Sequence, residues 1–155
     1  LAAFGAIAGL LTQAMPEREA HPAMYLRTLN LLDHLVTGED WIADYIGWEM
    51  LLLRDLGYGL DLSECASTGS RDDLIYVSPK SGRAVSQGGA GEWAAQMLPL
   101  PPVMRGGAVA GGEDIINALK TTGYFLEHRL FPALGREKLP EARARLLSRL
   151  GRQFQ

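Results

Sequence analysis

The sequence is poor in cysteine and has no long hydrophobic run. Cys65 is its one cysteine, so no disulfide can form within the chain, and a reducing compartment is compatible with it. The apolar segment 1–11 lacks a basic leader and is too short to span a bilayer, so we interpret it as a helix that lies on the core. No other segment is long and apolar enough to cross a membrane. Because the chain begins with Leu1 rather than methionine, we interpret it as a fragment or a processed chain.

Positive charge is scarce over most of the chain. Residues 1–128 carry 8 basic and 16 acidic side chains, whereas residues 129–155 carry 7 basic and 2 acidic ones. An acidic body repels phosphate, which predicts weak DNA binding. We expect an anionic partner to meet the C-terminal segment, where Arg145, Arg149 and Arg152 share a helix face. The alternative is that these cations simply suit the dipole at the end of a final helix.

The overall amino-acid composition is typical of one globular domain. With 155 residues, 47% apolar and 21% charged, we expect a single helical domain over 1–155. The glycine-rich segment 106–112 lacks the Lys-Ser/Thr ending of a phosphate-binding loop, so we reject a nucleotide site there.

Apolar residues recur at three- and four-residue steps, which predicts a mainly α-helical bundle. Pro22 and Gly38 mark the start and end of the second helix, and the short link before it predicts that the first two helices are antiparallel neighbours. The expected apolar face of the second helix is Tyr25, Leu26, Leu29, Leu32, Leu35 and Val36. Further helices are expected at 1–15, at 41–56 and, as a short stretch, at 92–98. A long helix is expected from residue 113, which Pro132 ends or kinks, and Pro140 should begin the final one. The proline-rich segment 99–102 should be a stiff, extended connector.

The helix expected over 41–56 should be the central one, because it is apolar over most of its circumference. Asp40 is its expected N-cap, and Gly57 is expected in the left-handed conformation at its end. Glu49 interrupts an apolar stripe of this helix. One interpretation is a buried carboxylate paired with an N–H or an arginine; the other, which we favour, is an edge position that reaches water.

Residues 62–90 predict an inserted β-hairpin. The segments 73–77 and 82–85 flank a Ser-Pro-Lys-Ser turn, which is a strand–turn–strand pattern.

The same insert has the outline of a zinc ribbon. Cys65 and Thr68 have the spacing of a C-x-x-C knuckle, Ser86 and Gly89 have that of its partner, and 17 residues separate the two. Structural zinc needs about four sulfur or nitrogen ligands. Because only Cys65 offers a thiolate, we predict a hairpin held by packing, without metal or cofactor.

Residues 48–59, with their aromatic-Glu pair and Leu-Gly-Tyr-Gly ending, followed by 60–65, resemble the RecO family of bacterial recombination mediators. The resemblance continues through 76–85 and the tail at 125–140, and so covers nearly the whole chain. It implies the family's C-terminal helical and ribbon part without the N-terminal OB-fold, because nothing in the chain reads as that β-barrel. The zinc ligands of many relatives fall at Cys65, Thr68, Ser86 and Gly89.

The resemblance also implies partners. RecO proteins are non-enzymatic mediators of DNA repair in the bacterial cytoplasm, at the nucleoid; they bind single-stranded DNA-binding protein, pair with RecR and help to load recombinase. The family's helical domain receives the C-terminal tail of single-stranded DNA-binding protein, an acidic segment that ends in apolar residues. Such a tail needs an apolar slot with a cation at its rim.

Our candidate slot is the face formed by Tyr45, Trp48 and Leu52, with Arg54 or Arg129 near the rim. The alternative is that these three apolar residues are plain core. Some relatives carry arginine just before the aromatic-Glu pair, where this chain has Ile46 and Gly47.

Two other classes of function stay open. Cys65 could be the nucleophile of an enzyme if His34 or His128 activated it, although no signature surrounds these residues. The chain could also be a helical interaction domain unrelated to repair.

Overall fold

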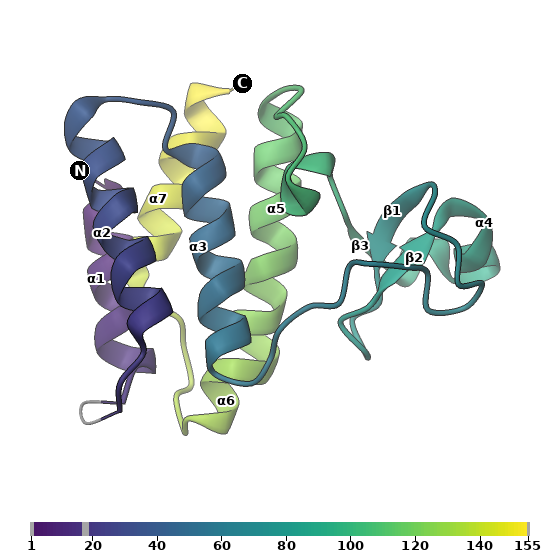
Figure 1. The fold of residues 1–155 in the computed structure, drawn as a ribbon, viewed down its shortest axis with the longest axis horizontal. Coiled ribbons are helices and arrows are strands. Elements are labelled where there is room, and N and C mark those ends of the chain that lie inside the picture. The colour runs from purple at the N-terminus through teal and green to yellow at the C-terminus, as the bar shows by residue number, and fades with distance from the viewer. Residues whose placement is uncertain (1, 17–18, 155) are drawn as a thin grey trace.

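The computed structural model describes residues 2–16 and 19–154, which form a bundle of helices with a small β-lobe at one side (Figure 1). Leu1, Glu17 and Arg18, which the sequence placed at the two ends of the first helix, lie outside the described residues. In chain order the elements are α1 (Ala2–Ala14), α2 (Pro22–Thr37), α3 (Ile42–Asp55), β1 (Leu74–Val77), β2 (Ala84–Ser86), α4 (Gln87–Ala90), the 3-10 helix η1 (Gly91–Gln96), β3 (Leu98–Pro99), the 3-10 helix η2 (Pro102–Arg105), α5 (Gly112–Phe125), the π-helical segment η3 (Leu126–Leu130), α6 (Phe131–Ala133) and α7 (Glu141–Gln153).

The mainly α-helical class is confirmed, and α3 is the central helix as predicted. Its side chains Ile46, Trp48 and Leu53 have no exposed surface. It begins after Trp41, which makes no side-chain cap, so the prediction of Asp40 as N-cap is wrong. Gly57 follows the helix at φ 96°, a positive value that glycine adopts at little cost.

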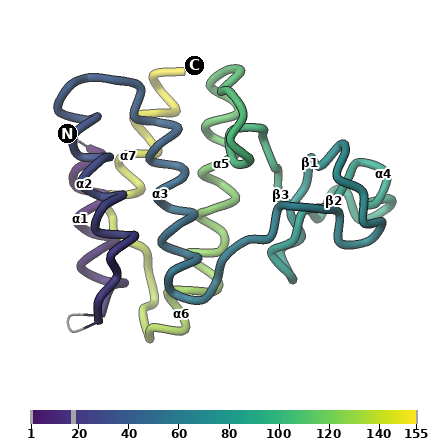
Figure 2. The backbone as a smooth tube through the Cα atoms, in the orientation of Figure 1, coloured from purple at the N-terminus to yellow at the C-terminus, as the bar shows by residue number. Residues whose placement is uncertain are grey.

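The first helix packs chiefly against α7 and much less against α2. The prediction that the first two helices pack together is therefore wrong for the main contact of α1. Two glycines of α1 face α7 and let the helices approach closely. A Cβ at Gly5 would lie 3.4 Å from the Cβ of Ala142, and one at Gly9 would lie 2.8 Å from that of Pro140. The tube in Figure 2 shows α1 and α7 together behind α2 and α3.

The second helix lies at the edge of the bundle, where it packs against α3. Pro22 stands in its first turn and Gly38 closes it at φ 77°, as predicted. Its apolar face is only partly covered, because Met24 and Leu31 are the buried residues. Of the six side chains that the sequence assigned to the buried face, Leu32 and Leu35 are partly buried against the core, and four are exposed: Tyr25 66%, Leu26 61%, Leu29 46% and Val36 76%.

The fifth helix continues without interruption through η3 into α6. Proline cannot donate the backbone hydrogen bond of a helix and crowds the preceding turn. A π-helical segment just before Pro132 relieves that crowding, and the helix ends one residue after the proline, at Ala133. None of the helices in the described part of the chain combines the length and apolar character needed to cross a bilayer.

The β-lobe contains a three-stranded antiparallel sheet in the order β2-β1-β3. The predicted hairpin is present: Val77 pairs with Ala84 and Tyr76 with Val85. β3 joins Leu98, the last residue of the short helix predicted at 92–98, to Pro99, the first residue of the predicted extended connector; Leu98 pairs with Val77 and Pro99 with Tyr76. After β2 the chain forms the helical turn α4 and then η1, a 3-10 helix over most of the stretch 92–98 in which the sequence predicted a short helix.

Candidate functional site: a ribbon clasp and a cationic pocket

The two knuckles of the predicted ribbon meet in the β-lobe. The backbone N–H of Ser86 donates to the Sγ of Cys65 at 3.2 Å, and the hydroxyl of Ser67 lies 3.3 Å from the same sulfur. Ser67 also donates to the carbonyl of Gly89 at 3.0 Å, and the N–H of Gly89 donates to the hydroxyl of Ser86 at 3.0 Å. This closed set of hydrogen bonds, which we call the ribbon clasp (Cys65, Ser67, Ser86 and Gly89), joins both knuckles.

The donor set of the ribbon clasp does not fit zinc. It offers one thiolate, hydroxyls that bind zinc poorly, and at Gly89 no side chain at all. Burial raises the pKa of the Cys65 thiol, but hydrogen bonds from Ser67, Ser86 and Thr68 outweigh it and lower the pKa to about 5. Within residues 2–16 and 19–154, no group of three or more His, Cys, Asp or Glu side chains could hold a metal ion.

The core of the helical body holds a buried ion pair. Glu49 on α3 has no exposed surface, and Arg143 on α7 meets it with two hydrogen bonds, from Nε to Oε2 at 2.7 Å and from Nη2 to Oε1 at 2.9 Å. The hydroxyls of Tyr45 and Thr122 each donate to the same carboxylate at 2.7 Å. Burial alone would raise the pKa of Glu49. The positive charge and hydrogen bonds of Arg143 outweigh this effect, so the pKa of Glu49 lies below its ordinary value. The favoured interpretation of Glu49 as a solvent-exposed edge residue is therefore wrong.

Arg143 was missed by the sequence reasoning, although a signal was present. It lies three and seven residues before Leu146 and Leu150, on the apolar face of the final helix. A charged residue on an apolar face requires a partner of opposite charge. Gly123 leaves room for it, because a Cβ there would lie 2.9 Å from Nη1 of Arg143.

The predicted slot on α3 is not an open surface. Tyr45, Trp48 and Leu52 have no exposed area, which agrees with the alternative that they are core. The rings of Tyr45 and Trp48 stack at a centroid distance of 5.8 Å, and the indole N–H of Trp48 donates to Thr28 at 2.8 Å. A peptide cannot reach this face without unfolding the bundle.

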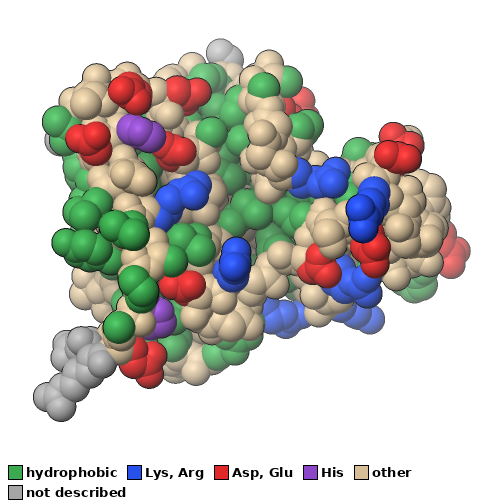
Figure 3. All heavy atoms as spheres, viewed as in Figure 1, with side chains coloured by type: hydrophobic (Ala, Val, Ile, Leu, Met, Phe, Trp, Pro, Cys, Tyr) green, Lys and Arg blue, Asp and Glu red, His purple; other side chains and the backbone are tan. Residues whose placement is uncertain are grey.

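The open pocket lies on the opposite face of α3, between that helix, α2 and η2. It has a volume of about 480 Å³. In the space-filling view, hydrophobic side chains line a hollow near the centre of this face, with basic side chains at its edge (Figure 3). The pocket is lined by Arg27, Ala43, Asp44, Gly47, Met50, Leu51, Arg54, Leu60, Val103, Met104, Gly106 and Gly107. We call it the cationic pocket. Of the predicted site residues it contains Arg54.

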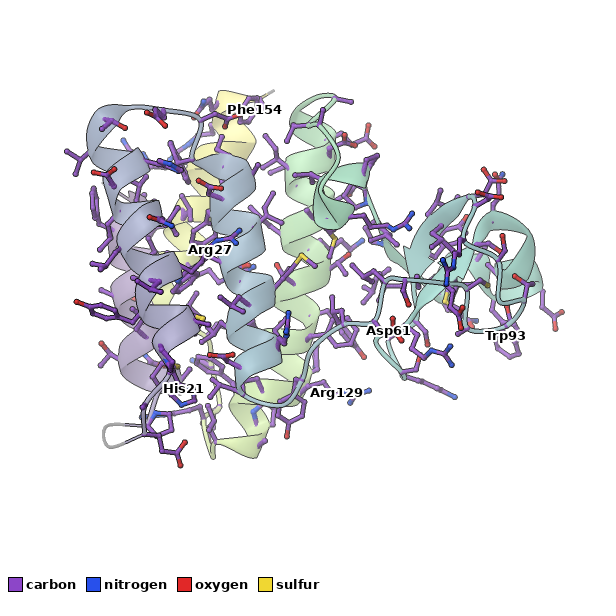
Figure 4. The ribbon with its side chains drawn as sticks, viewed as in Figure 1. His21, Arg27, Asp61, Trp93, Arg129 and Phe154 are labelled. Carbon is purple, nitrogen blue, oxygen red and sulfur yellow. The ribbon has the colours of Figure 1, made fainter. Side chains whose placement is uncertain are left out.

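Two guanidinium groups give the cationic pocket its charge. Arg27 reaches it from α2, as Figure 4 shows, and Arg54 from the last turn of α3. No ion pair joins either of them to a carboxylate of the described residues. The one acidic side chain in the lining, Asp44, is hydrogen-bonded to His34. The sequence did show a signal: Ala43, Gly47 and Met50 share a helix face that lacks the aromatic residues.

The remaining cationic candidates lie elsewhere. Arg129 donates from Nη2 to the carbonyl of Pro79 at 2.9 Å, so it ties η3 to the hairpin turn and does not reach the cationic pocket (Figure 4). Arg145, Arg149 and Arg152 are all exposed and line one shallow pocket on α7, on the shared face that their spacing predicted.

The structure does not bring Cys65 together with either of the histidines that were considered as its activating base. The hydrogen-bond partners of the Cys65 thiol are residues of the two knuckles, Ser67, Thr68 and Ser86. His34 is paired with Asp44, and His128 with Glu127. No hydrogen bond joins either histidine to the thiol among the residues that the structure describes, so neither can activate it in this arrangement.

The fold and site define a helical module with a ribbon-like insert and a cationic, apolar-lined pocket on its central helix. The family model described as Recombination protein O C terminal matches residues 1–138. The chain belongs to this family, RecO.

Curated proteins that resemble the chain belong to the same family. The chain is 55% identical over 153 residues to the DNA repair protein RecO of Ruegeria sp. (strain TM1040), covering 99% of this chain and 64% of the relative. It is 54% identical over 156 residues to that of Roseobacter denitrificans (99% and 64%) and 52% identical over 150 residues to that of Paracoccus denitrificans (97% and 61%). It thus spans less than two thirds of these relatives' lengths. No solved structure matches the chain.

Proposed function

We propose that this chain is the C-terminal docking part of a non-enzymatic recombination mediator that works in the bacterial cytoplasm. Its relatives are named as DNA repair proteins, which supports a role in recombination repair. In this role the chain binds the C-terminal tail of single-stranded DNA-binding protein, pairs with RecR and helps to load recombinase. DNA binding by the chain itself is weak, because residues 1–128 are strongly acidic.

The cationic pocket is the binding site that we propose for the tail. The single observation that carries this proposal is the position of two guanidinium groups, those of Arg27 and Arg54, at the edge of an apolar pocket, where no carboxylate of residues 2–16 and 19–154 forms an ion pair with them. An acidic peptide with an apolar end is complementary to such a surface. Its carboxylates pair with the arginines, and its last side chain packs against Leu51, Val103 and Met104.

Charge reversal tests the proposal. We expect Arg54→Glu to weaken binding of a tail peptide by about tenfold or more, because an ionic hydrogen bond is worth roughly 1.5–3 kcal/mol. Arg136→Glu, at an exposed arginine after α6 that forms no ion pair among the described residues and does not line the cationic pocket, is the control and should leave the dissociation constant unchanged. Isothermal titration calorimetry at two salt concentrations measures both. Equal weakening by the two variants would indicate attraction to the general field of the protein and would reject the pocket.

RecR pairing is tested separately, by co-elution of the chain with RecR. If the chain binds neither RecR nor the tail peptide, the alternative of a helical interaction domain unrelated to repair replaces the proposal.

A further inference from the structure

We infer that Gly47 is a positioning residue of the cationic pocket: because it has no side chain, the guanidinium of Arg27 can lie across α3 and form one cationic wall. This inference rests on the proposed function, because it concerns how the same pocket receives a carboxylate. The cation comes from α2, the neighbouring helix, and not from α3, on which Gly47 stands.

The geometry at Gly47 is specific to Arg27. A Cβ built on Gly47 would overlap Nη2 of Arg27 and would lie 3.6 Å from its Cζ. Apart from its chain neighbours and the nearby backbone of its own helix, no other described residue would have an atom within 4 Å of it. The guanidinium therefore occupies the volume that a side chain at this position would need. Both residues belong to the pocket lining.

Local helix stability does not explain this glycine. Gly47 lies in the interior of α3, where glycine is less favourable than alanine. It makes no left-handed turn, since φ at Gly47 is not among the positive values of the chain. What the missing side chain provides is the space that the guanidinium fills.

The arrangement leaves the Arg27 guanidinium available to a ligand. Arg27 is half-buried, and among residues 2–16 and 19–154 no carboxylate forms an ion pair with it. A half-buried guanidinium held against a helix loses little further freedom when a planar carboxylate binds it. An arginine that moved freely in solvent would bind the same group more weakly.

The test is Gly47→Ala. The added methyl displaces only the flexible end of Arg27 and improves helix propensity, so we expect the melting temperature to be kept or raised. The affinity for a tail peptide should fall about tenfold, because one charged hydrogen-bond partner is misplaced. Gly151→Ala on α7, where a Cβ would meet nothing within 4 Å, is the matched control and should bind as the unaltered chain does.

A double-variant cycle completes the test. Arg27→Ala should weaken binding as Gly47→Ala does, and combining them should cause no further loss, since both remove the same contact. If Gly47→Ala lowers the melting temperature, the double variant should restore it, because the overlap is gone, without restoring affinity. Full affinity in Gly47→Ala, or independent losses in the cycle, would overturn the inference while tail binding itself stands. No tail binding by the unaltered chain would instead reject the proposed function.

Discussion

The carboxylate of Glu49 links three helices, since its partners Tyr45, Thr122 and Arg143 come from α3, α5 and α7. Removing one charge of a buried pair leaves the other uncompensated. We expect Glu49→Gln to lower the free energy of unfolding by about 3–5 kcal/mol, as measured by urea unfolding. The control is Glu92→Gln on the exposed 3-10 helix η1, which should change the stability by less than about 0.5 kcal/mol.

The same carboxylate makes the stability depend on acid. The pKa of Glu49 is lower in the folded chain than its ordinary value of 4.5, so the unfolded chain binds more protons between these two values. The contribution of Glu49 is therefore complete above pH 4.5 and declines as pH falls through the folded-state pKa. The stability difference between the unaltered chain and Glu49→Gln should shrink below pH 4.5. A constant difference down to acid unfolding would contradict the assignment.

Adding one methyl group at Gly89 tests whether the ribbon clasp is tightly packed. A Cβ at this position would lie 2.5 Å from the hydroxyl of Ser67, 2.7 Å from the sulfur of Cys65 and 2.9 Å from the hydroxyl of Ser86. Overpacking of this kind costs about 1–3 kcal/mol, so Gly89→Ala should destabilise the lobe by that amount. Gly88→Ala, one residue earlier in α4 with open space around it, should not. Hydrogen exchange of the lobe amides measures both, and equal effects would reject the clasp.

At the scale of elements, α1 and α7 depend on close approach. Because a Cβ at Gly9 would lie 2.8 Å from the Cβ of Pro140, which is rigid, Gly9→Ala should force the helices apart and lower the melting temperature. A Cβ at Gly5 would make an ordinary contact of 3.4 Å with Ala142, so Gly5→Ala should be neutral or stabilising through helix propensity. The order of the two melting temperatures, measured by circular dichroism, checks this contact.

Sequence patterns predicted the secondary-structure elements better than they predicted which elements pack together. The helical periodicity and the Ser-Pro-Lys-Ser turn predicted the main helices and the β1–β2 hairpin, because both signals are local. They failed for α2, whose apolar residues Tyr25 and Val36 are mostly exposed, because an edge helix is covered only where a neighbour exists. They also failed to pair Glu49 with Arg143, since 94 positions separate the two and only packing brings them together.

At the scale of the whole molecule, the cationic pocket is assembled from four separate segments. Arg27 comes from α2, Arg54 from α3, Leu60 from the link to the β-lobe and Met104 from η2. The sequence identified Arg54 but placed it beside the face of Tyr45, Trp48 and Leu52, because aromatic residues at helical spacing are typical both of a peptide slot and of a core. Burial of Trp48 decided between the two.

Methionine methyl groups report on the pocket directly. Met50 and Met104 line it, whereas Met24 is buried elsewhere in the bundle and Met97 lies in the β-lobe just before β3. In spectra of the chain labelled with carbon-13 at the methionine methyls, addition of the tail peptide of single-stranded DNA-binding protein should shift Met50 and Met104 and leave Met24 and Met97 in place. Shifts confined to Met24 or Met97, or binding without any shift at Met50 and Met104, would contradict the account.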